Sequence, residues 1–278
     1  MYDINPVVKW AGGKRQLLDE LKNYMPKKYK TYYEPFIGGG ALFFSIQPKN
    51  AVINDSNSEL SNLYRTIRTK KPFKMLISTL DFHESNHSEE YYYNLRNIDK
   101  NQEEYNKLTR YEKSARTLYM NKACFNGLYR VNSKGEFNVP FNGKEAVKTY
   151  DLDNLNAMHE YLFNNKIKIC SKDYEKVVAS AKKGDFVYFD PPYDVLEDKQ
   201  SFTSYTKNDF GKKEQERLCK VFKRLSKRGV KVMLSNSNTE FIRELYKDFN
   251  IHIVKARRNI NSKGNNRGEV EEVIITNY

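Results

Sequence analysis

The sequence has little cysteine and no long apolar run. Its three cysteines are an odd number, form no Cys-x-x-Cys pair and lie in no cluster with histidine, so neither a disulfide framework nor a zinc or other metal site is indicated. No apolar stretch approaches the ~20 residues of a membrane-spanning helix, and residues 1–9 lack the apolar core of a signal peptide. We therefore expect a cytosolic protein with no membrane partner.

Positive charge, in contrast, is abundant. Lys and Arg number 48 against 35 Asp and Glu, which gives a net charge of +13, and there are 21 tyrosines. Basic side chains favour polyanions because they release counterions from phosphates, and tyrosines among them suit stacking on bases. On composition alone, a nucleic-acid-binding protein and a merely lysine-rich soluble protein fit equally well.

Seven short segments have the character of β-strands, with helical patterns between most of them. The expected strands are 31–35, 51–54, 166–170, 186–190, 230–235, 251–256 and 270–276, and the expected helices among them are 14–25, 41–46, 58–68, 213–228 and 239–248. This alternation predicts an α/β fold with a seven-stranded, mostly parallel, Rossmann-like sheet that carries helices on both faces. The last two strands are expected to close the sheet as an antiparallel hairpin.

One stretch breaks the alternation. Within residues 70–163 we expect helices at 89–97, 110–124 and 152–162, and a β-hairpin at 128–140 that turns at Ser133-Lys134-Gly135. We interpret 70–163 as an inserted, mainly helical domain. Residues 1–69 and 164–278 then form the domain that contains the sheet.

The most informative motif is Asp190-Pro191-Pro192-Tyr193, at the end of the most apolar expected strand. Proline fixes φ and has no N–H, and Pro192 keeps Pro191 out of helical angles, so the turn is stiff. It lies at the carboxyl edge of the sheet, where α/β proteins bind ligands. A surface turn with a buried tyrosine is the alternative interpretation.

These residue types suit an exocyclic amine on a base. The Asp190 carboxylate and the Pro191 carbonyl can accept both hydrogens of such an amine, which frees its delocalised lone pair for attack. Tyr193 can stack on the base, a contact worth ~1–3 kcal/mol.

Two further motifs are weaker on their own. Glycines at 38–40 follow a strand and precede a helix, and Asp55 stands 17 residues after Gly38 at the end of the next strand, where acids reach ribose hydroxyls in nucleotide-binding folds. The Trp-Ala-Gly-Gly-Lys segment at 10–14 is not a Walker A loop, because the spacing of its glycines differs and Arg15 follows Lys14. Taken alone, it favours a helix-initiating turn with Trp10 in the core over a ligand contact.

Together, Asp-Pro-Pro-Tyr, the Phe-x-Gly-x-Gly loop at 36–40 and Trp-Ala-Gly-Gly-Lys resemble the DNA adenine-N6 methyltransferases of the Dam family, and their order resembles its α-class arrangement over residues 7–273. The resemblance implies transfer of a methyl group from S-adenosyl-L-methionine to N6 of an adenine flipped out of double-stranded DNA, within GATC, by a monomer that needs no metal. It also implies that residues 70–163 recognise the DNA target.

The same resemblance implies roles for individual residues. The implied contacts to S-adenosylmethionine are Trp10, Ala11 and Lys14, then Phe36, Gly38 and Gly40 on its methionine side, Asp55 on the ribose, Asp173 on the adenine, and Asp190, which also touches the target base. The implied contacts to DNA are Lys9 at an outer guanine, Phe125 as a wedge in the vacated stack, Asn126 beside it, and Leu128, Arg130 and Pro140 at base edges.

Three alternatives stay open on the active-site residues. An RNA adenine-N6 methyltransferase would use the same chemistry, and so would a cytosine-N4 enzyme, although the latter more often has Ser-Pro-Pro-Tyr. A DNA-binding regulator without catalysis is the third, and the intact set of polar groups argues against it.

Overall fold

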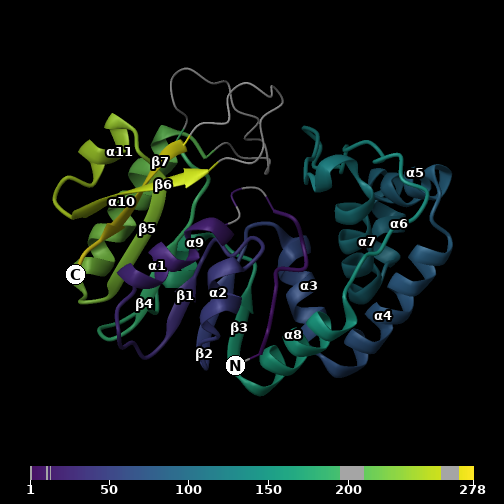
Figure 1. Ribbon diagram of the computed structural model, residues 1–278, viewed down its shortest axis with the longest axis horizontal. Coiled ribbons are helices and arrows are strands. Elements are labelled where there is room, and N and C mark those ends of the chain that lie inside the picture. Colours follow the sequence, from purple (N-terminus) through teal and green to yellow (C-terminus); the bar gives the residue numbers. More distant parts are fainter. Residues whose placement is uncertain (1, 11, 13, 195–209, 258–268) are drawn as a thin grey trace.

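The computed structural model describes residues 2–10, 12, 14–194, 210–257 and 269–278, and these form a three-layer α/β fold around one sheet (Figure 1). The strand order is β3-β2-β1-β4-β5-β7-β6. The strands are β1 (Tyr32–Glu34), β2 (Asn50–Asn54), β3 (Lys166–Cys170), β4 (Phe186–Phe189), β5 (Lys231–Ser237), β6 (Asn250–Arg257) and β7 (Glu269–Thr276). Strands β1 to β5 pair in parallel, and β7 runs antiparallel to both β5 and β6. The predicted fold class, including the terminal hairpin, is confirmed.

Adjacent side chains of the central strands face opposite layers. Tyr32 and Phe186 belong to the apolar core on one face, while their neighbours Tyr33 and Val187 belong to the core on the other. Because strand side chains alternate with a period of two, a strand buried on both faces has a continuous apolar sequence, as in Phe186–Phe189.

Helices cover both faces of the sheet. The first core takes apolar residues from α1 (Leu18–Tyr24), α2 (Ala41–Ile46), α3 (Ser58–Arg68) and α8 (Leu152–Asn164). The second takes them from α9 (Tyr174–Val178), α10 (Lys212–Lys227) and α11 (Glu240–Leu245). Among the described residues, no helix is both long and apolar enough to cross a bilayer.

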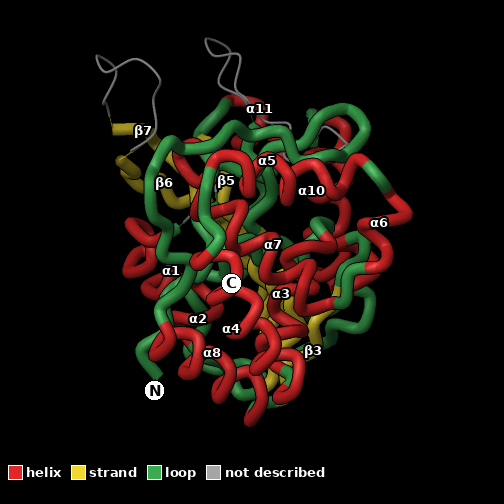
Figure 2. Tube along the Cα trace, turned by 90° about the vertical axis from the view of Figure 1, so that its right-hand side faces the viewer, coloured by secondary structure: helices red, strands yellow, loops and turns green. Residues whose placement is uncertain are grey.

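The segment between β2 and β3 extends the molecule sideways. It contains α4 (Lys70–Ser85), α5 (Glu89–Asn97), α6 (Gln102–Lys107) and α7 (Arg110–Ala123), and Figure 2 looks onto this helical part. Two short 3-10 turns, Ile98–Lys100 and Phe125–Gly127, lie in this segment, and a third, Arg15–Leu17, precedes α1. A third apolar core, built around Tyr92, Tyr119 and Phe137, is confined to this part, but Leu76 of α4 and Leu118 of α7 join the first core. The boundaries at 69/70 and 163/164 therefore stay a prediction.

The expected hairpin forms only in part. The chain doubles back at the predicted turn, where Gly135 has φ +86° and donates to the carbonyl of Asn132 at 2.9 Å. Its arms share an isolated bridge between Val131 and Phe137. Two backbone hydrogen bonds also join them, from the Asn132 N–H to the Glu136 carbonyl at 2.9 Å and from the Asn138 N–H to the Arg130 carbonyl at 3.1 Å, but no regular strand pair forms over 128–140. Side chains rather than a ladder hold this segment, as described below.

The sheet reverses its direction of growth between β1 and β4. From β1 the chain builds β2 and β3 on one side, and β4 and β5 on the other. Ligands of open α/β sheets bind at the carboxyl ends of strands flanking such a switch point. The loops that follow Glu34 and Phe189 flank it here, and both carry predicted site residues.

Candidate active site

Lys14 joins the two most distant motifs of the sequence. Its Nζ lies 3.0 Å from Oδ1 of Asp190 and 4.4 Å from the centre of the Tyr193 ring. It also donates to the carbonyl of Gly12 at 2.7 Å, and it is only 7% exposed. The 10–14 segment and the 190–193 turn thus form one site at the switch point.

The 190–193 turn combines a half-buried acid with an anchored aromatic ring. Burial raises the pKa of Asp190 to about 6, against the lowering effect of the Lys14 ammonium. The Tyr193 hydroxyl donates to Oε2 of Glu272 at 2.9 Å, and burial raises its pKa well above the usual value. The phenol therefore stays protonated and keeps its ring in place beside Asp190.

The 36–40 glycine loop packs directly on Trp10. A Cβ on Gly38, whose φ is +48°, would come within 2.8 Å of Cδ1 of the indole, so this position excludes other residues. The Gly38 carbonyl accepts from the Tyr64 hydroxyl at 2.7 Å. Gly40, at φ +72°, turns the chain into α2.

Asp55 anchors this loop from the end of β2. Its Oδ2 accepts from the N–H of Gly38 at 2.9 Å, and its Oδ1 accepts from the N–H of Asn57 at 2.8 Å. Burial raises the pKa of Asp55 to about 6, and these two N–H groups lower it. A carboxylate accepts more than two hydrogen bonds, so a vicinal diol can still bind here.

Asp173 follows β3 and caps α9. Its Oδ1 accepts from the N–H of Glu175 and forms an ion pair with Nη2 of Arg217 at 2.7 Å. Phe36 lies against the adjacent Tyr174, with ring centres 5.2 Å apart. The structure therefore brings Phe36 and Asp173 to the same side of the sheet edge. Ala11 lies outside the described residues.

A second face gathers residues predicted to touch DNA. Asn121 of α7 accepts from the Lys9 N–H at 2.7 Å and donates to the carbonyls of Lys9 and Gly127 at 2.9 and 3.1 Å. The exposed Lys9 is thereby fixed against the turn at Phe125–Gly127. Trp10 follows at once and packs on Tyr129, with ring centres 5.0 Å apart, so this face adjoins the 10–14 segment.

Phe125 and Pro140 lie together on this face. Phe125 is 51% exposed although it is aromatic, and its N–H donates to the Pro140 carbonyl at 2.9 Å. Asn126 is exposed and adopts a left-handed backbone at φ 55°, while Leu128 is half-buried. An exposed ring held on a fixed backbone is the geometry a base-stack wedge needs.

Arg130 is already oriented by its cross-strand neighbour. Its Nε donates to Oδ1 of Asn138 at 2.8 Å, and its Nη2 donates to the Asn138 carbonyl at 3.2 Å. One edge of the guanidinium is thus engaged.

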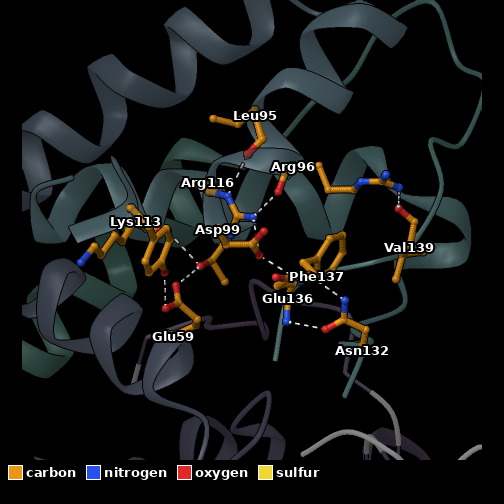
Figure 3. A network of polar contacts seen from close by, with 12 residues as sticks. Glu59, Leu95, Arg96, Asp99, Lys113, Arg116, Asn132, Glu136, Phe137 and Val139 are labelled. Atoms are coloured by element: carbon orange, nitrogen blue, oxygen red, sulfur yellow. Dashed lines mark hydrogen bonds and ion pairs between the residues drawn. The ribbon is translucent and has the colours of Figure 1, made fainter. Parts of the chain in front are cut away.

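A buried ion pair between Arg116 and Asp99 supports the 128–140 segment (Figure 3). Arg116 of α7 lies 2.8 Å from Oδ2 of Asp99 and also donates to the carbonyls of Leu95 and Arg96. The same Asp99 oxygen accepts from the N–H of Phe137 at 2.9 Å. The backbone of the 128–140 segment is therefore tied to helices α5 and α7.

Comparison with known proteins decides the family. Residues 10–260 match the D12 class N6 adenine-specific DNA methyltransferase family. The chain belongs to this family. The methyltransferase is thus shown to act on adenine N6 in DNA, and neither the RNA-modifying, the cytosine-N4 nor the non-catalytic alternative is favoured. The family also implies S-adenosylmethionine as methyl donor.

Its relatives cover the whole chain. It is 49% identical over 276 residues to Type II methyltransferase M1.LlaDCHI of Lactococcus lactis subsp. cremoris, a match that covers 99% of this chain and 96% of that protein. It is 41% identical to Type II methyltransferase M.MjaIII of Methanocaldococcus jannaschii, covering 99% and 100%. It is 33% identical to the DNA adenine methylase of Escherichia coli strain K12, covering 96% and 93%.

Two acids of the methyltransferase escaped the sequence analysis. Glu34, at the end of β1, is 3% exposed and accepts from the Tyr32 hydroxyl at 2.7 Å, and burial raises its pKa to about 8. Glu272 of β7 holds Tyr193. Glu34 is the one acid of a buried strand, and that contrast is the signal by which it could have been found. Glu272 is one of three glutamates in β7, so nothing in the local sequence distinguishes it.

Proposed function

We propose that this DNA adenine-N6 methyltransferase modifies the adenine of GATC and that the 190–193 turn is its catalytic centre. The observation that carries the proposal is the meeting of Lys14, Asp190 and Tyr193 at the switch point of the sheet. The resemblance of the sequence to the Dam family, which implies GATC and contacts to base edges from Leu128, Arg130 and Pro140, supports the choice of DNA site.

The residues around the switch point fit S-adenosylmethionine. A left-handed glycine loop at Gly38 and Gly40 and a carboxylate at Asp55 are suited to an amino-acid tail and a ribose diol. Trp10, Lys14, Phe36 and Asp173 would complete the binding site. When bound, this cofactor supplies an electrophilic methyl group on a sulfonium.

The chain itself positions and activates the amine. Asp190 accepts a hydrogen bond from one N6–H and the Pro191 carbonyl accepts a hydrogen bond from the other. The lone pair of N6 is then less delocalised into the ring and is free to attack the methyl group. Tyr193 stacks on the flipped adenine, and Lys14 favours the ionised form of Asp190. The work of catalysis is positioning and electrostatics, after a base-flipping step that costs a few kcal/mol.

The 125–140 segment would read the site. Arg130 donates to a guanine, which discriminates by ~1–3 kcal/mol against a wrong base, while Leu128 and Pro140 contact base edges. Lys9 contacts an outer guanine, and Phe125 with Asn126 fills the vacated stack. Double-stranded DNA is therefore the substrate, and one chain suffices for one adenine at a time.

The test is the variant Asp190→Ala. We expect no transfer of tritiated methyl groups to a GATC duplex, with DNA binding still measurable because the recognition segment is intact. Asp248→Ala, which changes an exposed acid paired with Lys223, is the control and keeps wild-type turnover. Retained turnover in Asp190→Ala refutes the assigned centre.

A further inference from the structure

Two completely buried amides lie behind the 190–193 turn. Gln215 of α10 and Asn236 near the end of β5 are both 0% exposed. Asn236 Nδ2 donates to Gln215 Oε1 at 3.0 Å. A buried polar side chain is costly unless each of its groups is paired, so the remaining atoms of this pair identify what it holds.

The remaining amide atoms of Gln215 and Asn236 bind the backbone at the end of the 190–193 turn. Gln215 Nε2 donates to the carbonyl of Pro192 at 2.9 Å, and Asn236 Oδ1 accepts from the N–H of Asp194 at 2.9 Å. Ser237 adds a third contact, because its hydroxyl donates to the Asp194 carbonyl at 2.9 Å. The turn is thus clamped from α10 and β5 together.

The orientation of both amides is forced by these partners. A carbonyl can only accept and an N–H can only donate, so Gln215 must present its nitrogen to Pro192, and Asn236 must present its oxygen to Asp194. Turning either amide around would leave two buried groups of like kind facing each other. The chain of contacts from Pro192 through both amides to Asp194 has therefore one arrangement.

The 190–193 turn needs such side-chain contacts because its own backbone has few hydrogen-bond donors. Pro191 and Pro192 have no N–H, so the usual ladder and turn hydrogen bonds are unavailable there. The carbonyls of these two prolines are adjacent, and only one of them is assigned to the adenine amine. A clamp that engages the second leaves the first in place for the substrate.

We propose that Gln215 and Asn236 are positioning residues for methyl transfer: by fixing the Pro192 carbonyl and the Asp194 N–H, they aim the Pro191 carbonyl at the target amine. This rests on the proposed role of the 190–193 turn. The pair touches the turn and not the glycine loop, so the loss of the clamp acts on the chemical step and leaves cofactor binding intact.

The experiment compares kcat and KM of three variants on a GATC duplex. Gln215→Met keeps the length of the side chain and removes the donor. We expect kcat to fall by about 10- to 100-fold, the scale of a misplacement of about 1 Å, while KM for S-adenosylmethionine stays within about 3-fold. Asn236→Asp retains the acceptor for Asp194 but not the donor for Gln215, and its kcat falls as well.

Gln215→Glu gives a readout that a merely structural role would not move. The ionised carboxylate cannot donate to the Pro192 carbonyl, whereas the protonated carboxyl can. The ratio of the kcat of this variant to that of the wild type therefore rises as the pH falls. A ratio independent of pH contradicts the proposal, and so does a wild-type kcat in Gln215→Met.

Asn277→Ala is the matched control. Asn277 makes the same two kinds of contact at the other end of β5, where it accepts from the Val232 N–H at 2.7 Å and donates to the Val230 carbonyl at 2.9 Å. We expect a lower Tm with kcat within about 2-fold of wild type. If Asn277→Ala lowers kcat as much as Gln215→Met, the effect is general destabilisation and the proposal is overturned.

The two proposals fail separately. If Asp190→Ala retains turnover, the catalytic centre itself is wrong. If Asp190→Ala is inactive while Gln215→Met has wild-type kinetics, only the clamp is wrong.

Discussion

The pairing of Lys14 with Asp190 shows how one residue sets the working state of another. In the proposed role the acid must be ionised to accept a hydrogen bond from the amine, yet burial raises its pKa to about 6. The ammonium 3.0 Å away opposes that shift. A carboxylate poised in this way is a good acceptor near neutral pH without being fully solvated.

The pH dependence of turnover follows from this balance. Because the pKa of Asp190 is raised, its protonated form accumulates as the pH falls through about 6. We expect single-turnover rates to fall toward tenfold per pH unit below that value and to level off above it. A rate that is constant from about pH 7 to about pH 4.5, with DNA binding unchanged, contradicts this role.

Removing the Lys14 ammonium is expected to shift the acidic part of the pH–rate profile, where the rate falls as Asp190 becomes protonated. In Lys14→Met the lowering influence on the pKa of Asp190 is lost, so the acid limb moves to higher pH and the rate at neutral pH decreases. The measurement is the same pH–rate profile at saturating cofactor. An unchanged limb would show that Lys14 does not act on Asp190.

Among the elements, the 128–140 segment depends on groups far from it in the sequence. Its arms form one bridge and a few backbone hydrogen bonds but no ladder, so its shape also depends on the side chains of Asp99, Arg116 and Asn138. Asp99 and Arg116 are 11% and 6% exposed, and breaking a buried pair leaves an uncompensated charge.

Asp99→Ala is therefore expected to be strongly destabilising. It removes the acceptor for the Phe137 N–H and leaves the buried Arg116 guanidinium without its ion-pair partner. The free energy of unfolding is expected to fall by ~3–5 kcal/mol. Urea unfolding measures the loss. Asp99→Asn keeps an acceptor for Phe137 and is expected to lose less, and equal stabilities of the two variants would rule out the backbone contact as a contributor.

Arg130→Ala is expected to act on recognition instead. Discrimination at one guanine of GATC decreases by ~1–3 kcal/mol, while thermal stability falls by less than in Asp99→Ala, because the substitution removes two hydrogen bonds of a half-buried side chain and breaks no buried ion pair. Methylation rates on duplexes with single base changes measure this. Unchanged preferences would remove Arg130 from the set of base-reading residues.

Local sequence patterns were sufficient to predict the strands of the sheet, but not the side-chain contacts that support the 190–193 turn. The apolar run Phe186–Phe189 and the alternation around it predicted strand type and order of elements. Helix α4 was not predicted, since Pro72 and its lysine neighbours suggest a loop; proline is tolerated in the first turn, where its missing N–H is not needed. Helices α6 and α9 are short and were also not predicted.

Gln215 illustrates what sequence reasoning missed. It lies in a run of charged residues, where glutamine suggests a solvated surface. Yet its spacing to Leu218, Cys219 and Phe222 places it on the buried stripe of α10. The stripe was visible, but its partner Asn236 lies on another strand, and only the tertiary fold brings the two together.

For the whole molecule, the first apolar core joins the sheet to the inserted helices. Leu76 and Leu118 of the inserted segment belong to the same core as Phe43 of α2 and Ile53 of β2. The 10–14 segment adds a second connection, since Trp10 contacts both Gly38 and Tyr129. The sheet and the inserted segment are thus joined by a shared apolar core and by the contacts of Trp10.

We therefore expect a single cooperative unfolding transition. Trp10 is the only tryptophan of the chain, so its fluorescence reports on the contact between the two parts, while far-ultraviolet circular dichroism reports on all helices. The two urea curves should coincide. Separate midpoints would show that the inserted segment unfolds independently.

The most direct test of the account is the single-turnover rate of Asp190→Asn at saturating DNA and cofactor. The substitution keeps the size of the side chain and removes the charge that accepts the amine hydrogen. We predict a fall of about 100-fold or more, with DNA affinity within about 3-fold of wild type. A rate within a few-fold of wild type would contradict the central claim that a charged acid in the 190–193 turn activates the adenine amine.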